Sequence, residues 1–285
     1  MSRAKLTAAV LFAAAVAGGT WLDARAPLRR SSSSILVADL HVHPYPGDGS
    51  LPVWELQHEA WRRGLDVIAV TGHNNRFGLQ FGRIVPLDPA GPIVLPGQEI
   101  TSSNFHMTAV GIPQLVDWRL GARAAIAAIH AQGGVAIAAH PTPGSWRDRD
   151  IDALRAIDGT EVAHQSLRPF STSRELFEDF FRRVQSINPN VSPIGSSDFH
   201  MAAPMGLCRT YLLVSERSAE GALDAIRSGR TVARDARGML FGAAGHIAAV
   251  EAYLSAAPPA PAAGAAEGYA ALLAMLALAA LAVVY

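Results

Sequence analysis

The chain has 285 residues, enough for one domain of ordinary size with additional segments, and half of them are hydrophobic, so a sizeable core can be buried. It carries 24 basic and 24 acidic residues without a basic cluster, which argues against nucleic-acid binding. The single cysteine, Cys208, excludes an intrachain disulfide, and we expect it to be a small buried side chain.

Residues 1–34 have the composition of a signal peptide or an N-terminal anchor followed by a linker. Arg3 and Lys5 precede an apolar run over Leu6–Leu22, the pattern of a secretory signal. Ala24-Arg25-Ala26 offers a cleavage site, whereas the length of the run also allows it to stay as a membrane anchor, so both outcomes remain open. The basic start favours a cytoplasmic N-terminus, and we therefore expect a membrane-anchored domain exported to the periplasm or the extracytoplasmic face.

Between residues 35 and 235, short apolar runs alternate with stretches of helical periodicity. The runs are bounded by glycine, proline or polar residues and predict seven strands: Ile35–Leu40, Asp66–Val70, Ile93–Leu95, Met107–Gly111, Val135–Ala139, Ser192–Gly195 and Thr210–Val214. Apolar residues at helical spacing, with a glycine after three of the four stretches, predict helices over Val53–Arg63, Ala122–Gln132, Ser173–Val184 and Ala219–Ser228. This alternation predicts an α/β domain with helices outside a sheet, and seven strands favour a closed barrel over an open sheet.

Residues 236–268 are rich in alanine and proline and predict a stiff spacer after the domain. Residues 269–285 contain no charged side chain, and a tyrosine stands at each end of this run. Its length is at the lower limit for a membrane-spanning helix, which is the structure we expect. The alternative is an alanine- and leucine-rich helix packed on the domain, which the proline-rich spacer disfavours.

Residues of metal-binding type follow the predicted strands, at the end where barrels of this kind carry their chemistry. His41 and His43 come after the first strand, and a spacing of two on an extended chain puts both imidazoles on one face. Asp48 lies between two glycines in a tight turn that can swing its carboxylate back. The other candidates stand at or beside the ends of later strands: His73, Glu99, His106, His140, Asp198 and His200.

Six histidines and three carboxylates therefore converge on one side of the predicted barrel. They exceed what one tetrahedral zinc ion needs, so the set predicts a site for two or three metal ions. The absence of thiolates argues against a structural zinc site. Three further histidines, His58, His130 and His246, fall in helix-like or terminal segments, and we expect them to be structural or exposed to solvent.

The motifs between Leu36 and Ala233 resemble the polymerase and histidinol phosphatase (PHP) domain family of metal-dependent phosphoesterases. The matching motifs, in order, are Asp39-Leu-His-Val-His43, Gly47-Asp-Gly49, Gly97-Gln-Glu99, Ala139-His-Pro141 and Ser197-Asp-Phe-His200. The segment Ala222–Thr231 also resembles the closing helix and strand of the family. The resemblance implies a distorted (β/α)7 TIM-like barrel that binds two to three divalent ions of zinc, manganese or iron.

The resemblance also implies a role for each candidate ligand. The ligands of a first metal would be His41, His43, Glu99 and Asp198; Glu99 would bridge to a second metal held by His106 and His140; Asp48, His73 and His200 would hold a third. Many members carry Asp-His where this chain has Gly72-His73. The missing carboxylate is expected to weaken the third metal or to change the choice of substrate.

Such a centre favours hydrolysis, because adjacent metal ions lower the pKa of water and polarise the scissile group. The resemblance implies a small-molecule phosphoric ester as substrate. Glu99 is then the central catalytic residue, and His200 and His73 are candidates for proton transfer. Three arginines are candidates for binding the substrate anion: Arg76, Arg147 and Arg209.

Other functions remain open at this stage. The same metals would hydrolyse a carboxylic ester, an amide or a carbamate outside the cytoplasm. A non-catalytic metal-binding module is disfavoured because every ligand position of the family is filled. A role in DNA proofreading or repair conflicts with the expected export signal and with the neutral charge.

Overall fold

The structure is a computed structural model, and it describes residues 34–143, 146–147, 150–164, 174–201 and 204–256, together with Thr7, Val10 and Ser32. The chain from Arg30 to Ala257 forms one compact unit. The expected signal or anchor, the end of the spacer and the expected transmembrane helix at 269–285 lie outside the described residues. Within the described part of the chain, no helix is both long and apolar enough to cross a membrane.

All ten described strands belong to one sheet. The strands are β1 (Ile35–Val42), β2 (Val67–Val70), β3 (Ile93–Thr101), β4 (His106–Val110), β5 (Val135–Ala138), β6 (Gly159–His164), β7 (Ser192–Ser196), β8 (Arg209–Leu213), β9 (Thr231–Arg234) and β10 (Leu240–Gly242). Their order across the sheet is β10-β9-β8-β1-β2-β3-β4-β5-β6-β7. The pairs β1–β2, β2–β3, β5–β6 and β6–β7 are parallel, whereas the other neighbours are antiparallel.

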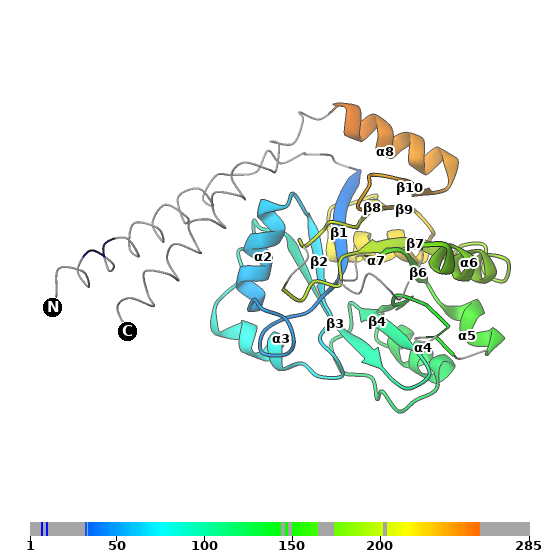
Figure 1. Cartoon of the computed structure of the whole chain (residues 1–285), viewed down its shortest axis with the longest axis horizontal. Helices are drawn as coiled ribbons and strands as arrows, with labels where there is room; N and C mark the ends of the chain where they lie inside the picture. The colour runs from blue at the N-terminus through cyan, green and yellow to red at the C-terminus, as the bar shows by residue number, and fades with distance from the viewer. Residues whose placement is uncertain are drawn as a thin grey trace. The chain divides into compact units, whose positions relative to one another are not determined.

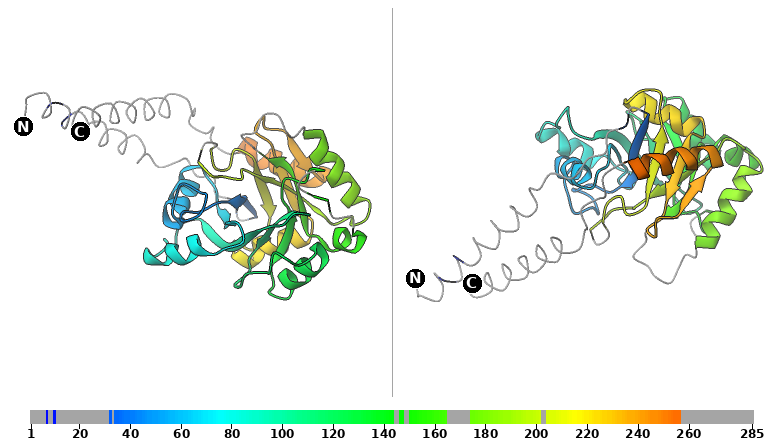
Figure 2. Two further views of the ribbon diagram at one scale, coloured as in Figure 1. Left: turned by 60° about the horizontal axis from the view of Figure 1, so that its bottom comes forward. Right: turned by 90° about the horizontal axis from the view of Figure 1, so that it is seen from above.

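The sheet curls round until β7, at one edge, lies against β1 and β8, with the helices outside (Figures 1 and 2). A parallel bridge pairs Val42, at the end of β1, with Phe199, just after β7. The backbone N–H of His43 donates to the carbonyl oxygen of Phe199 at 2.9 Å. Beside this bridge, the N–H of Gly195 in β7 donates to the hydroxyl of Thr210 in β8 at 2.9 Å. The expected α/β fold is therefore confirmed as a nearly closed, barrel-like sheet.

The helices that the periodicity predicts are present with nearly the expected bounds. They are α2 (Val53–Arg62), α4 (Ala122–His130), α6 (Arg174–Gln185) and α7 (Ala219–Arg227). Three short or weakly patterned helices and one 3-10 turn were not predicted: α3 (Phe77–Phe81), η1 (Gly82–Ile84), α5 (Ile151–Ala156) and α8 (Ala244–Ala256). In α4, for example, Ala122, Ala125, Ile126 and Ile129 are buried, which is the stripe that a helix packed on a sheet requires.

Two expectations, one about the strands and one about the end of the domain, are wrong. The seven predicted strands omit β6, β9 and β10. Strand β6 is hard to recognise in the sequence because Glu161 interrupts its apolar run. The domain also continues beyond residue 235, where we expected a spacer. In α8, Val250 is buried and packs in the same cluster as Ile35 and Val37 of β1, so residues up to 256 are part of the domain.

Strand β1 runs through the middle of the sheet and is buried over its whole length. Its buried polar side chains need hydrogen-bond partners, because an unpaired polar group inside a protein is costly. The carboxylate of Asp39 accepts hydrogen bonds from the backbone N–H groups of Ser197 at 3.0 Å and Gly206 at 2.8 Å. Asp39 therefore fastens the loop after β7 against β1. Cys208 is buried as expected, and burial raises the pKa of its thiol to about 12.

Candidate metal centre

The innermost group of candidate ligands consists of His41, His43, Glu99 and Asp198. His41 and His43 come from the end of β1, and their Nε2 atoms lie 3.1 Å apart. The Nε2 atoms lie 3.2 Å (His41) and 3.0 Å (His43) from Oδ1 of Asp198, and each lies 3.4 Å from Oε2 of Glu99. Both imidazoles are fully buried. Two nitrogens and two carboxylate oxygens thus converge on one buried point.

The two carboxylate oxygens that face this point lack a hydrogen-bond partner. They are Oε2 of Glu99 and Oδ1 of Asp198, both buried. A buried carboxylate oxygen without a donor is costly unless a cation balances it. Among the described residues, no lysine or arginine forms an ion pair with Glu99 or Asp198. The geometry of this group therefore fits a metal ion.

A second group consists of Glu99, His106 and His140. In the antiparallel pair β3–β4, His106 stands opposite Thr101, two residues beyond Glu99, so the two side chains lie diagonally on one face. Oε1 of Glu99 lies 3.0 Å from Nδ1 of His106 and 3.2 Å from Nε2 of His140. The two oxygens of Glu99 therefore face two different groups of histidines.

A third, outer group consists of His43, Asp48, His73 and His200. Oδ1 of Asp48 lies 3.0 Å from Nδ1 of His43, and Oδ2 lies 3.1 Å from Nε2 of both His73 and His200. The side chains of Asp48, His73 and His200 are 44%, 36% and 31% exposed, whereas that of His43 is buried. The outer group is therefore the side of the centre that solvent reaches. All nine candidate ligands lie in these three groups.

The electrostatics of the cluster favour a bound cation. Burial by itself would lower the pKa of His41, but the charges of Asp198, Glu161 and Glu99 outweigh it and raise this pKa well above its ordinary value. Burial opposes protonation of His43 and His73 too, yet their contacts with the carboxylates of Asp198 and Asp48, respectively, raise their pKa values to about 10 and about 9. In the other direction, burial alone would raise the pKa of Glu99, but the His41 charge and the hydrogen bonds with His106 and His140 together hold this pKa well below its ordinary value. The Glu99 carboxylate therefore stays ionised, and it offers negative charge to a cation.

Two residues next to the inner group were not predicted from the sequence. Glu161 and His164 lie on β6, and His164 forms a further set of candidate ligands with His41 and His140. A histidine that follows a short run at the end of a strand was the signal used for His140, and it was available for His164 as well. It was overlooked because β6 itself was not recognised.

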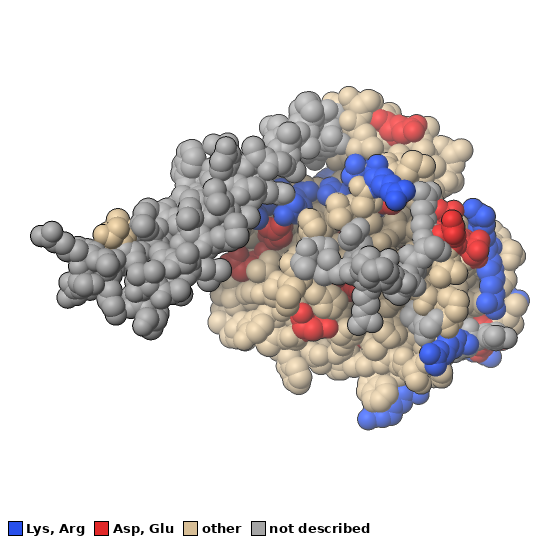
Figure 3. All heavy atoms as spheres, in the orientation of Figure 1, with Lys and Arg blue, Asp and Glu red and all other residues tan. Residues whose placement is uncertain are grey.

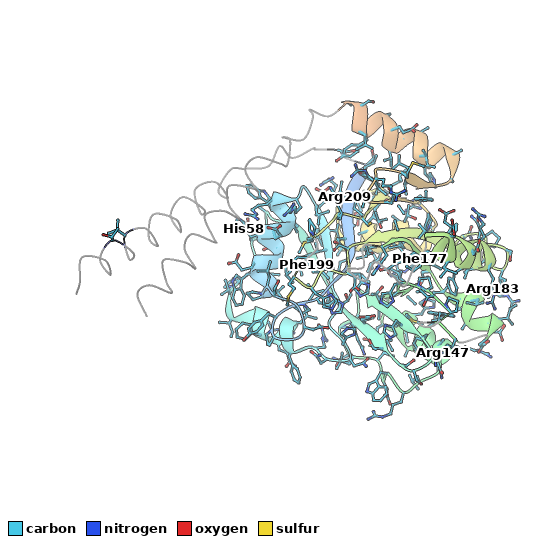
Figure 4. The ribbon with its side chains drawn as sticks, viewed as in Figure 1. His58, Arg147, Phe177, Arg183, Phe199 and Arg209 are labelled. Carbon is cyan, nitrogen blue, oxygen red and sulfur yellow. The ribbon has the colours of Figure 1, made fainter. Side chains whose placement is uncertain are left out.

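Of the three arginines expected to bind a substrate anion, Arg76 and Arg209 make side-chain contacts with backbone carbonyl oxygens. The guanidinium of Arg76 donates to the carbonyl oxygen of Pro113. That of Arg209 donates to the carbonyl oxygen of Gly206 at 2.6 Å, and burial lowers its pKa. Arg147 has an exposed side chain, and it lies apart from Arg209 in the domain (Figure 4). These contacts favour structural roles for Arg76 and Arg209.

The three histidines expected to be structural or exposed lie away from the metal groups. His58 is exposed on α2, where its ring stacks on Trp61 (Figure 4). His130 forms an ion pair with Asp158 at 2.8 Å, and His246 lies in α8. In the described part of the chain, none of the three belongs to a group that could hold a metal ion.

No protein-family model and no curated protein matches this sequence. Among solved structures, the chain is similar to a two-domain protein from Bacteroides vulgatus that contains a predicted PHP-like metal-dependent phosphoesterase. The TM-score is 0.60 at 20% identity, and the match covers 80% of this chain and 71% of that chain. The chain is also similar to PsfC from Pseudomonas syringae, with a TM-score of 0.54 at 18% identity over 78% of this chain and 98% of that chain. At these identities, the likeness establishes a shared fold. The chain therefore has the fold of a PHP-like metal-dependent phosphoesterase, as its motifs indicate.

Proposed function

We propose that this protein is a metal-dependent hydrolase, and that it cleaves a small-molecule phosphoric ester with two or three divalent ions of zinc, manganese or iron. The observation that supports this most is the position of Glu99. Its Oε2 lies 3.4 Å or less from Nε2 of His41, Nε2 of His43 and Nδ1 of His73, while its Oε1 faces His106 and His140. One buried carboxylate between two sets of imidazoles is the arrangement that holds two cations close together.

The hydrogen bonds of the histidines prepare their nitrogens for metal binding. Nδ1 of His200 lies 2.9 Å from the carbonyl oxygen of Asp198 and donates a hydrogen bond to it, because this oxygen can only accept. Nδ1 of His41 lies 3.0 Å from the carboxylate of Glu161, which likewise accepts. With a metal bound, each ring would keep its proton on Nδ1, so Nε2 would be the nitrogen that binds the metal.

The exposure of the ligands suggests how a substrate approaches. Bound metal ions would lower the pKa of a water molecule and polarise the scissile group. His41 and His43 are buried, whereas Asp48, His73 and His200 are the most exposed candidate ligands, so the ester is proposed to enter past these three. In hydrolysis the oxygen of water forms a bond to phosphorus as the bond from phosphorus to the ester oxygen breaks; water gives up a proton, and the ester oxygen takes one up. His73 and His200 stand on the open side, where this proton is needed.

The charge of the surface fits a small substrate better than a nucleic acid. Basic and acidic side chains are interspersed on the face shown in Figure 3, so this face carries no extended basic patch. Nucleic-acid binding depends on such a patch. A small-molecule ester is therefore the proposed substrate, and the terminal apolar segments are proposed to place the domain at a membrane outside the cytoplasm.

The proposal is tested by metal content and hydrolysis in parallel. The purified protein is stripped with a chelator, reloaded with zinc or manganese, and assayed with p-nitrophenyl phosphate and p-nitrophenyl acetate. We expect about two to three ions per chain and hydrolysis of the phosphate ester that disappears on stripping and returns on reloading. Glu99→Gln keeps the size of the side chain but removes the shared charge. Because activated water contributes several kcal/mol, this variant should lose about a thousandfold in rate.

The matched control is His130→Gln, which alters a histidine outside the centre and should keep the rate within a few fold. Circular dichroism has to show that both variants are folded. Equal rates in the two variants would contradict the role of Glu99. If only the acetate ester were cleaved in a metal-dependent way, the protein would still be a hydrolase, but its substrate would be a carboxylic ester and not a phosphoric ester.

A further inference from the structure

The strand β6 carries two ionisable side chains towards the centre. In a regular strand, residues 161 and 164 would point to opposite faces, because successive side chains alternate. The pairing with β7 shifts, however: Glu161 stands opposite Ile194, whereas Ala163 stands opposite Gly195. This extra residue is a β-bulge, and a bulge of this kind re-aims the side chains that follow it. As a result, Glu161 and His164 face the same side.

Glu161 is fully buried and uses both of its oxygens. Its Oε1 lies 3.0 Å from Nδ1 of His41, and its Oε2 accepts the backbone N–H of His140 at 2.6 Å. Two N–H donors from two candidate ligands thus meet one carboxylate. An amide in its place would offer one acceptor and one donor, so one of these contacts would become repulsive.

His164 makes the corresponding contact with Asp198. Its Nε2 lies 3.2 Å from Oδ2 of Asp198, and its side chain is 3% exposed. The other oxygen of Asp198, Oδ1, has no hydrogen-bond partner and points at His41 and His43. The ring of His164 also contacts that of Phe177 in α6, with ring centroids 6.0 Å apart. His164 therefore fixes the outer oxygen of Asp198 while the inner oxygen stays free.

We propose that Glu161 and His164 are positioning residues of the inner metal site, and that β6 uses its bulge to supply both. Each holds the outer atom of a candidate ligand, His41 or Asp198, and so aims the inner atom at the metal. This inference rests on the metal-dependent function proposed above. The alternative is that His164 binds a metal itself, because it lies in a group with His41 and His140. We favour positioning because its Nε2 already faces Oδ2 of Asp198.

His164→Leu and His164→Gln separate these roles. Glutamine keeps an N–H donor for Asp198, whereas leucine does not. Zinc affinity is measured on the stripped full-length protein by competition with a chromophoric chelator, and the visible spectrum of the cobalt-loaded protein reports ligand geometry. We expect His164→Leu to lose about 10- to 100-fold in affinity and to change the cobalt spectrum. His164→Gln should restore the spectrum and most of the affinity.

Equal losses in both variants would overturn the positioning role and indicate a direct ligand. Wild-type affinity in both would show that His164 has no part in the site. Glu161→Gln gives an independent test, for which we expect an affinity loss of about tenfold or more. His130→Gln is the control, since His130 also pairs with an aspartate but lies outside the centre. Unchanged binding in Glu161→Gln would overturn the inference, whereas absence of metal in the wild type would refute the proposed function itself.

Discussion

Three residues other than glycine have a positive φ angle in the described part of the chain, and all three lie at the candidate metal centre. The angles are 46° for Asn74, 30° for His140 and 50° for Asp198. Such conformations cost on the order of 1 kcal/mol each or more and persist only where other contacts stabilise them. The N–H of His140 donates to Glu161, and Asn74 exchanges two hydrogen bonds with the backbone of Thr101. Backbone strain is therefore concentrated where ligands are presented.

His130 allows a pH-dependent prediction away from the centre. A hydrogen bond to Asp158 raises the pKa of His130 above its ordinary value of 6.5, against smaller opposing effects of burial and of Arg227. A raised folded-state pKa stabilises the protein below pH 6.5, and this contribution disappears as the pH rises through the folded-state value. The stability difference between the wild type and His130→Gln should therefore be larger at mildly acidic pH than at alkaline pH. Thermal unfolding at both pH values measures it.

The effect should be small, because the side chain of His130 is 39% exposed and solvent screens the pair. A stability difference that stays constant or grows towards alkaline pH would contradict the assignment of this ion pair.

The sequence predicts those residues of the centre that stand at the ends of strands. His41, His140 and Asp198 follow apolar runs, and parallel strands bring such ends together at one edge. His164 also ends a strand, but β6 itself is not recognised from its sequence. Glu161 lies in the middle of that strand, and both side chains face the same side only because a bulge shifts the alternation. Alternation in the sequence alone does not reveal a bulge.

At the scale of the elements, the contact between β7 and β8 depends on a glycine. A Cβ atom on Gly195 would lie 2.5 Å from the carbonyl oxygen of Arg209, which is backbone of the neighbouring strand. Gly195→Ala should therefore push the strands apart and lower the free energy of unfolding by about 1–3 kcal/mol. Urea unfolding measures this change.

Gly121→Ala is the matched control for this substitution. Gly121 precedes α4 with a φ of −65°, and a Cβ atom there meets nothing within 4 Å. We expect Gly121→Ala to change the free energy of unfolding by less than about 1 kcal/mol. If both variants unfold at the same urea concentration, a side chain at position 195 does not destabilise the contact between β7 and β8, and the prediction is wrong.

The helices show which elements periodicity can predict. The helices α2, α4, α6 and α7 each have a buried apolar stripe or strong amphipathic pattern, and their bounds were predicted closely. In α8, alanine predominates and the apolar residues are spread round the helix, so its sequence was interpreted as part of a spacer. Only packing against the domain, in one cluster with Tyr211, Val232 and Leu240, distinguishes this helix from a linker.

At the scale of the whole molecule, the class of fold was predicted but the number and direction of the strands were not. Alternating strands and helices indicate a parallel sheet, yet β8, β9 and β10 are antiparallel additions beside β1. Closure depends on the bridge between Val42 and Phe199, a contact between residues far apart in the sequence. Local patterns carry no information on such a contact, whereas the likeness to a solved structure with a predicted PHP-like domain supports the fold as a whole.

The central claim is that metal ions occupy the centre around Glu99. Anomalous X-ray scattering from crystals of the protein loaded with zinc or manganese tests it most directly, because the peaks locate the metals independently of activity. We predict at least two peaks, one within coordination distance of His41, His43, Glu99 and Asp198 and another beside Glu99, His106 and His140. Fully loaded crystals without a peak at Glu99 would contradict the account.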